Sequence, residues 1–276
     1  MTSHKQSGHR WTSPSATLNT IRKLQTDRLY RDTHGLFFIE GVRNFIQASD
    51  NQFNIEVILH SERLLTAPLA RKLVRQHRRA GVPTFNVSPE TFRTISQRER
   101  ASGVAAIVRQ RWRRLRDTSP NGTLCWTVLG HLRSAGNFGT LIRSSEAVGG
   151  AGFILLDSRA DPYDPGAVRA SMGAIFRQQF VRTSLNGLRR WANAHHSVLI
   201  GASAEGAHSF HQFEFPPTTL LLLGEERRGL TPQQKSLCKH LVSIPMVGQA
   251  DSLNVGVAGS LLLYEIYRAR TQQAIR

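Results

Sequence analysis

The sequence predicts an α/β protein whose larger, C-terminal part is built on a parallel β-sheet. Short apolar runs alternate with helical patterns along the chain, as they do in βα units. Two of these runs, residues 153–156 and 220–223, are continuously apolar, which is typical of strands covered on both faces. Polar, glycine-containing loops follow three of the runs. In an open α/β sheet, such loops meet at the carboxyl ends of the strands, where ligands bind.

Composition limits the class of protein. The chain has 276 residues, of which 40% are hydrophobic, enough for one large or two modest domains. Its apolar runs are far shorter than the roughly 18 residues of a membrane span, so we expect no membrane association. Residues 1–19 are polar and lack the apolar segment of a secretory signal, so we expect a disordered tail there. Cys125 and Cys238 form no CxxC pair, which predicts reduced core residues in a cytoplasmic protein.

Positive charge is concentrated in the first part of the chain. Lysine and arginine total 36 against 19 acidic residues, a formal net charge of +17. Residues 1–116 carry 21 basic and 8 acidic residues (+13), and the remainder carries 15 and 11 (+4). Solubility alone rarely needs so large an excess. The asymmetry favours a nucleic acid partner for the first part of the chain.

Residues 20–108 alternate helical and strand patterns. Strands are expected at residues 55–59, 83–87 and 104–108, and helices at residues 68–80 and 89–96. This order predicts a small α/β sandwich.

A basic segment separates the two parts. Residues 109–116 contain five arginines and Trp112, and the turn-rich residues 117–122 complete a linker. Two interpretations of Trp112 stay open at this point. Its ring stacks on a nucleic acid base, or it anchors a solvated linker.

The second part repeats the alternation. Strands are expected at residues 124–129, 152–156, 198–201, 219–223 and 241–244. In the helix predicted over residues 138–148, Phe138, Leu141, Ile142 and Ser145 share one stripe and Arg143 lies off it. A last helix over residues 255–267 is apolar nearly all round, with small residues that permit close packing.

Three motifs carry the chemistry of the C-terminal part: residues 136–143 (GNFGTLIR), 223–230 (LGEERRGL) and 244–258, which ends in SLNVGVA. Each follows an expected strand and leads into a helical pattern. The chain lacks a dinucleotide fingerprint, a phosphate-binding P-loop and a GxSxG elbow. It also lacks HExxH and Cys/His clusters, so no metal is expected.

In order and wording, the three motifs resemble the SpoU family of RNA ribose 2′-O-methyltransferases in the SPOUT superfamily. The resemblance runs from about Thr20 to Arg270, and the first part resembles the ribosomal-protein-like domain that binds RNA in many of these enzymes. It implies a SPOUT-type knotted parallel-sheet catalytic domain, a homodimer, and S-adenosyl-L-methionine as cofactor. The expected domains are a tail at 1–19, an RNA substrate-binding domain at 20–108, a basic linker at 109–122 and a methyltransferase domain at 123–276.

The implied substrate is structured RNA, and the basic first domain favours ribosomal RNA. Two alternatives stay open: a transfer RNA ribose methyltransferase, and a non-catalytic RNA-binding or ribosome-assembly protein with the same fold.

The resemblance also implies roles for single residues. Gly224, Ile244 and Leu253 are expected to hold the cofactor. The residues expected to act on the ribose or to orient it are Arg143, Asn137, Glu226, Ser252 and Asn254. Guanidinium is always protonated in proteins, so Arg143 is expected to fix a phosphate and stabilise negative charge on the 2′-oxygen. Helix capping is the structural alternative for Asn137, Ser252 and Asn254.

The sequence departs from the common family pattern at three places. Ser134 and Ala135 stand where many relatives have Asp-Pro, Arg227 replaces a common glycine, and Gly256 replaces a common serine. None of these changes removes a residue with an expected role.

Overall fold

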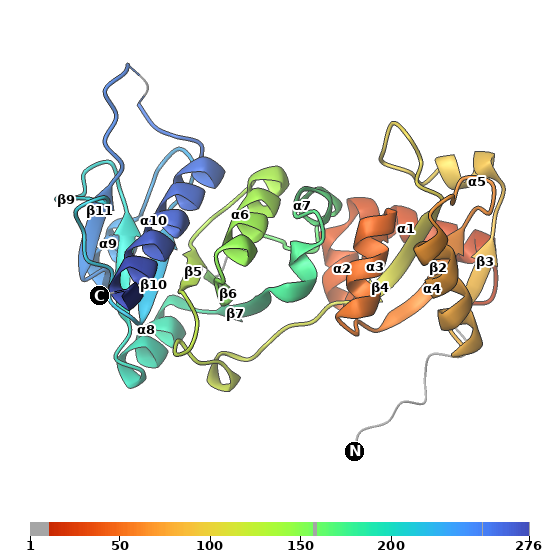
Figure 1. Ribbon diagram of the computed structural model, residues 1–276, viewed down its shortest axis with the longest axis horizontal. Helices are drawn as coiled ribbons and strands as arrows, with labels where there is room; N and C mark the ends of the chain where they lie inside the picture. The colour runs from red at the N-terminus through yellow and green to blue at the C-terminus, as the bar shows by residue number, and fades with distance from the viewer. Residues whose placement is uncertain (1–10, 157–158, 250, 276) are drawn as a thin grey trace. The chain divides into compact units, whose positions relative to one another are not determined.

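A computed structural model of the chain describes residues 11–156, 159–249 and 251–275, which form two compact units (Figure 1). The first unit contains the described residues up to Gln110 together with Tyr163–Phe176. The second contains the described parts of Arg111–Pro162 and Arg177–Arg276. Among the described residues, no helix combines the length and the apolar character that a membrane crossing requires.

The first unit is an α/β sandwich around a four-stranded sheet. Its strands are β1 (Leu36–Glu40), β2 (Ile55–His60), β3 (Thr84–Asn86) and β4 (Val104–Arg109). Their order is β1-β4-β2-β3, with β4 antiparallel to both neighbours and β3 parallel to β2. The helices are α1 (Pro14–Thr26), α2 (Arg28–His34), α3 (Val42–Asp50), α4 (Pro68–Arg79), α5 (Pro89–Arg93) and α7 (Pro165–Ala170).

The expected tail over residues 1–19 extends too far along the chain. Residues 1–10 lie outside the described residues, but Trp11 is buried and α1 begins at Pro14, with Ser13 as its N-cap. Leu18, Ile21 and Leu24 are spaced by three residues and pack into the core of the first unit, so this segment gains apolar burial by forming a helix.

The segment Tyr163–Phe176 was expected in the methyltransferase domain but packs into the first unit. The ring centroid of Tyr163 lies 4.6 Å from that of Phe37, and Phe176 lies edge-on to Phe53 at 5.0 Å. These aromatic contacts give the segment a hydrophobic attachment to the N-terminal sheet. The expected domain boundary at residue 123 therefore does not separate the two units cleanly.

Among the described residues of the second unit, a seven-stranded sheet has the order β7-β6-β5-β10-β8-β11-β9, and every pair is parallel. Its strands are β5 (Trp126–Leu129), β6 (Gly152–Leu156), β7 (Gln179–Thr183), β8 (Val198–Ala202), β9 (His208–Ser209), β10 (Thr219–Leu223) and β11 (His240–Ser243). The helices are η1 (Leu115–Asp117), α6 (Ala135–Ala147), α8 (Leu185–Ala194), α9 (Pro232–Leu237) and α10 (Val255–Ile275).

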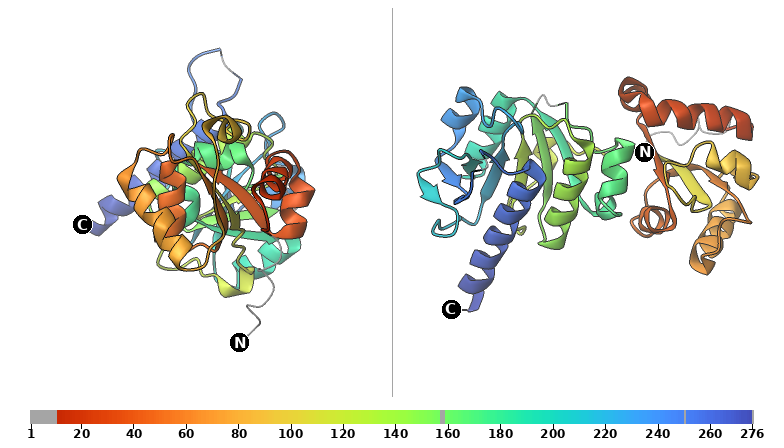
Figure 2. Two further views of the ribbon diagram at one scale, coloured as in Figure 1. Left: turned by 90° about the vertical axis from the view of Figure 1, so that its right-hand side faces the viewer. Right: turned by 90° about the horizontal axis from the view of Figure 1, so that it is seen from above.

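Helices cover both faces of this sheet. On one face, Trp126 and Leu222 pack with Leu188 and Trp191 of α8. On the other face, α6 and α10 lie side by side (Figures 1 and 2). A Cβ atom on Gly259 of α10 would lie 2.4 Å from Leu141 Cδ2, which shows how closely these two helices approach. The continuously apolar strands thus form the two-sided core that the sequence predicted.

The basic segment before β5 is anchored to the second unit. The Arg113 amide donates to the Phe180 carbonyl of β7 at 2.9 Å. The half-buried Trp112 lies edge-on to Phe180, and the guanidinium carbon of Arg182 is 3.8 Å from the centre of the Trp112 ring. One face of the ring is therefore occupied by a cation, which favours the anchor interpretation over base stacking.

Candidate functional site

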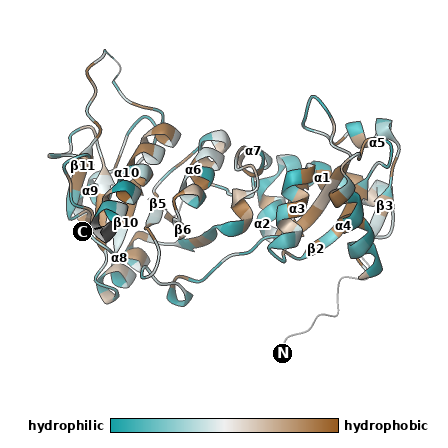
Figure 3. Cartoon of the chain, in the orientation of Figure 1, coloured by the Kyte–Doolittle hydropathy of each residue, from teal (hydrophilic) through white to brown (hydrophobic). Residues whose placement is uncertain are grey.

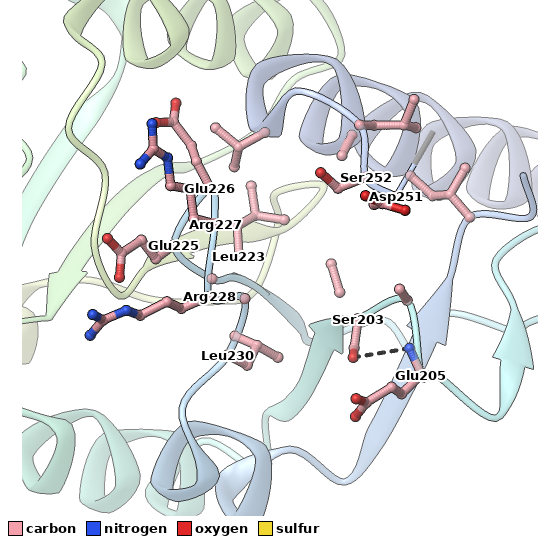
Figure 4. A pocket seen from close by; sticks show the side chains of 18 of the residues that line it. Ser203, Glu205, Leu223, Glu225, Glu226, Arg227, Arg228, Leu230, Asp251 and Ser252 are labelled. Carbon is pink, nitrogen blue, oxygen red and sulfur yellow. Dashed lines mark hydrogen bonds between the residues drawn. The ribbon is translucent and has the colours of Figure 1, made fainter. Parts of the chain in front are cut away.

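A cavity of about 310 Å³ opens at the carboxyl ends of β8, β10 and β11 (Figure 4). Its size lies within the range typical of small-molecule sites. Three segments supply most of its wall: residues 202–205 at the end of β8, residues 223–230 at the end of β10, and residues 251–253 before α10. The second and third motifs therefore meet at one edge of the parallel sheet, as expected for an α/β fold.

All three residues expected to hold the cofactor line this cavity. Gly224 follows β10, Ile244 follows β11, and Leu253 precedes α10. Ile244 and Leu253 are half-buried, so each presents apolar surface to the cavity while packing against the protein.

Gly224 is required by the shape of its own loop. The loop closes through two hydrogen bonds of 2.9 Å, in which the amides of Glu225 and Gly229 each donate to the carbonyl of the other residue. A Cβ atom on Gly224 would lie 2.2 Å from the Gly229 carbonyl carbon and 2.5 Å from the Leu230 amide nitrogen. Only glycine fits there without displacing backbone.

A chain of polar side chains joins the three motifs. The Asn137 Nδ2 atom donates to Glu226 Oε1, and the Asn254 Nδ2 atom donates to Asn137 Oδ1 at 3.0 Å. Asn254 Oδ1 accepts from the amides of Gly256 (2.9 Å) and Val257 (3.3 Å). The first, second and third motifs are thus linked by Asn137, Glu226 and Asn254, although these residues lie far apart in the sequence.

The donors and acceptors in this polar chain fix the orientation of the Asn137 and Asn254 side-chain amides. Asn254 Oδ1 faces backbone N–H groups, which only donate, so its Nδ2 atom faces Asn137. Asn137 must then accept with Oδ1 and donate with Nδ2, and Glu226 accepts through Oε1. Every hydrogen bond of the network therefore donates in one direction, from the backbone amides at the start of α10 through Asn254 and Asn137 to Glu226.

Capping roles differ in part from the expectation. Asn254 caps α10, as proposed for Ser252 or Asn254. Asn137 does not cap α6, because Ser134 Oγ accepts from its amide at 3.2 Å and occupies the N-cap position. Ser134 is one of the departures from the family pattern, and a serine satisfies a helix N-terminus about as well as an aspartate.

Ser252 and Arg143 remain outside the polar chain. Ser252 is exposed, lines the cavity, and makes no hydrogen bond with any described residue. Arg143 is exposed on α6, opposite the buried stripe that contains Leu141 and Ile142, as predicted. It does not line the cavity, and its side chain forms no ion pair or hydrogen bond within the described part of the chain.

The sequence reasoning missed one wall of the cavity. Residues 202–205 at the end of β8 and Lys235 of α9 also line it, and Lys235 Nζ lies 2.5 Å from Glu205 Oε2. The signal was present, because β8 was an expected parallel strand and the loop at its carboxyl end belongs to the same edge of the sheet.

The two cysteines are protonated at neutral pH. Burial raises the pKa of Cys125 to about 12 and that of Cys238 to about 11, so both are protonated thiols at neutral pH. Across the described ranges, no group of three His, Cys, Asp or Glu side chains is arranged to hold a metal ion.

Comparison with known proteins agrees with this geometry. Residues 126–264 match the SpoU rRNA Methylase family, and residues 16–106 match the MRM3-like substrate binding domain. The first match spans the sheet, the cavity and the polar chain. The chain belongs to the SpoU rRNA methylase family.

Full-length relatives support this membership. The chain is 31% identical over 268 residues to a 23S rRNA (uridine(2479)-2′-O)-methyltransferase from Streptomyces viridochromogenes, covering 95% of this chain and 92% of the relative. It is also similar to the crystal structure of the SpoU methyltransferase AviRb from that organism in complex with AdoMet, with a TM-score of 0.82, 31% identity and coverage of 93% and 98%.

An AdoMet-bound rRNA methyltransferase from Sinorhizobium meliloti gives a TM-score of 0.84 at 28% identity, covering 93% of this chain and 96% of that one. These likenesses confirm the predicted family and the α/β SPOUT-type fold with an N-terminal substrate-binding domain. The trefoil knot within that fold stays a prediction.

Proposed function

We propose that this protein transfers a methyl group from S-adenosyl-L-methionine to a ribose 2′-hydroxyl of ribosomal RNA. The observation that carries the proposal is that the second and third family motifs line one cavity, while a polar chain joins the first motif to both of them. The named activities of the relatives, 2′-O-methylation of 23S rRNA among them, favour ribosomal over transfer RNA. Because ribosomal RNA is the substrate, we infer that the protein acts in the cytoplasm.

The cavity fits the cofactor in size and in chemistry. Backbone of the loop beginning at Gly224 supplies polar groups, while Ile244 and Leu253 supply apolar surface for the adenine. When bound, the cofactor supplies an electrophilic methyl group on its sulfonium. The protein's own task is to align the ribose oxygen with that methyl group and to accommodate the loss of the hydroxyl proton.

The polar chain orients the reaction site. Glu226 and Asn254 hold Asn137 from two sides, so the first turn of α6 keeps a fixed position beside the cavity loop. Arg143, two turns further along α6, is free to bind the phosphate beside the target ribose and to stabilise negative charge on the 2′-oxygen. Ser252, exposed at the cavity, is available to orient the ribose.

A homodimer completes the proposed enzyme. Four apolar or aromatic side chains of α10 are 41–53% exposed: Val257, Leu261, Tyr264 and Tyr267. Val257, Leu261 and Tyr264 lie along one stripe of the helix, beside α6. An exposed apolar stripe of this kind is typical of a protein interface. A second copy packed there brings its own residues near Arg143, which no described residue of the same chain engages.

The first unit is proposed to bind the RNA through α4, among other surfaces. One side of α4 packs against the first unit through the buried Ala70 and Val74 and the half-buried His77. The opposite side carries the exposed Lys72, Arg75 and Arg79. These three side chains bond to no described residue, and α4 contains no acidic residue. Figure 3 shows α4 coloured largely as hydrophilic. Unpaired cations on one helix face are suited to contacts with the phosphate backbone.

The test of the proposed function is transfer of a labelled methyl group from S-adenosylmethionine to 23S rRNA and transfer RNA transcripts. We expect label on the ribosomal transcript, and the methylated linkage should resist alkaline hydrolysis. The rate of methyl transfer should fall at least about 100-fold for Arg143→Ala. Arg190→Ala serves as the matched control, because Arg190 is an exposed arginine of α8 in the same unit.

Other outcomes select the alternatives. Label on transfer RNA alone would make this a transfer RNA methyltransferase. Absence of label on either RNA, with RNA bound and no affinity for the cofactor, would indicate a non-catalytic assembly protein.

A further inference from the structure

Hydrogen bonds and one ion pair hold the loop after β10 at its base and along one side. Its base closes through the paired hydrogen bonds of Glu225 and Gly229, and the close approach of Gly224 leaves no room for the loop to relax inward. Glu226 is bound by Asn137, and Glu225 lies 3.5 Å from the Arg133 guanidinium. The tip of the loop, Arg227 and Arg228, therefore has a fixed starting position.

Both arginines at this tip are exposed and line the cavity. Neither forms a hydrogen bond or an ion pair with any described residue. Acidic side chains line the same cavity, but they are engaged elsewhere: Glu225 and Glu226 as described above, and Glu205 with the lysine of α9. Asp251, also a lining residue, lies on the opposite side of the cavity from Arg228 (Figure 4).

The charge of the cofactor argues against a role for this arginine pair in holding it. S-adenosylmethionine carries one carboxylate, one ammonium and one sulfonium, so its net charge is positive. Two unpaired guanidinium groups at the cavity repel that net charge, whereas they attract a polyanion. Arginine also binds phosphate through two parallel hydrogen bonds, which gives orientation as well as affinity.

From this geometry we infer that Arg227 and Arg228 bind backbone phosphate of the RNA at the mouth of the cofactor cavity. They help to place the target ribose over the methyl donor. This inference rests on the proposed function, and it assigns to this chain a phosphate contact at position 227, where the family pattern commonly has glycine.

The experiment compares Arg227→Ala, Arg228→Ala and the double variant with the wild type and with Arg190→Ala, which removes the same charge from an exposed site on α8. RNA affinity is measured with a 23S rRNA transcript without cofactor, across a series of salt concentrations. Cofactor affinity is measured by calorimetry without RNA, and the KM for RNA is measured in the methyl-transfer assay. Arg227→Lys is added because it keeps the charge and removes the fork-shaped donor set.

Each alanine variant is expected to weaken RNA binding about 5- to 10-fold and to lower the slope of log K against log salt by about 0.7–0.9. Cofactor affinity should stay unchanged or rise. The KM for RNA should increase with little change in kcat, and Arg227→Lys should recover only part of the loss.

Two results would overturn the inference. In one, RNA affinity and salt slope of the double variant equal those of Arg190→Ala. In the other, cofactor affinity falls as steeply as RNA affinity, which would assign the arginines to the cofactor carboxylate. Because RNA binding is measured without catalysis, failure of methyl transfer by the wild type would count against the proposed function alone.

Discussion

Replacing Gly224 with alanine is expected to weaken cofactor binding without unfolding the protein. The new Cβ atom would lie 2.2 Å from the Gly229 carbonyl carbon, 2.4 Å from its oxygen and 2.5 Å from the Leu230 nitrogen. All three are backbone atoms, so no side-chain rotation relieves the clash. Overpacking of this kind costs about 1–3 kcal/mol. The loop can relieve it by opening at Gly229, and cofactor binding must then close it again. The dissociation constant should rise about 5- to 150-fold.

The assay is calorimetric titration with S-adenosylmethionine, together with thermal unfolding of the same preparations. Gly248→Ala is the matched control, since a Cβ atom on Gly248 would meet nothing within 4 Å. If Gly224→Ala binds the cofactor as tightly as the control does, the loop tolerates a side chain at this position. The argument that the closed loop forms the cofactor site would then be wrong.

Three further predictions concern the supporting structure. Asn137→Ala should raise the cofactor dissociation constant severalfold in calorimetry. Asn137 does not line the cavity, but the substitution removes the hydrogen bond that holds Glu226 and therefore loosens the loop that carries Glu226. Gly259→Ala should lower the free energy of unfolding by at most about 2 kcal/mol in thermal unfolding. The new methyl group would lie 2.4 Å from Leu141 Cδ2 and 2.7 Å from Leu223 Cδ1, the ends of two buried side chains that must shift, and the helix propensity of alanine offsets about 1 kcal/mol of that cost. A loss above about 3 kcal/mol would contradict this. Burial lowers the pKa of His77 below its usual 6.5. The folded protein therefore binds a proton at His77 less readily than the unfolded chain, and its stability falls as the pH drops below about 6.5. His77→Gln should lose less melting temperature between pH 7 and pH 5 than the wild type loses. An equal loss in the two proteins would refute the argument.

Much of the fold could be predicted from local sequence. The apolar runs at β6 and β10 coincide with the expected strands because both lie inside the sheet and are buried on both faces. β7 escaped prediction because only Phe180 and Val181 are apolar and fully buried within it, which leaves no continuous run. β9 has two residues, too few for a period of any kind. The start of α1 was missed because the polar residues before Leu18 masked its periodicity.

The site was predictable as a set of residues but not as a set of contacts. The motifs named Asn137, Glu226 and Asn254, yet the partners of Asn137 lie 89 and 117 residues away along the chain. Capping of α6 was the local interpretation for Asn137. It is not observed, since Ser134 occupies the cap. Local spacing does not encode which loops become neighbours, because strand order decides it.

Strand order also explains why cofactor binding and orientation of the ribose are coupled in this fold. β10 follows β5 and β8 in the sequence but lies between them in the sheet. The loop after β10 therefore has the first motif on one side and, on the other, the cavity wall formed by residues 202–205. Its five residues from Glu225 to Gly229 therefore serve two structures at once. Glu226 extends to Asn137 in the polar chain, while the backbone beginning at Gly224 lines the cavity. A ligand that binds the closed loop stabilises the arrangement in which Asn137 and Asn254 hold α6 against α10. By thermodynamic reciprocity, an ordered polar chain favours binding of the ligand to the same extent.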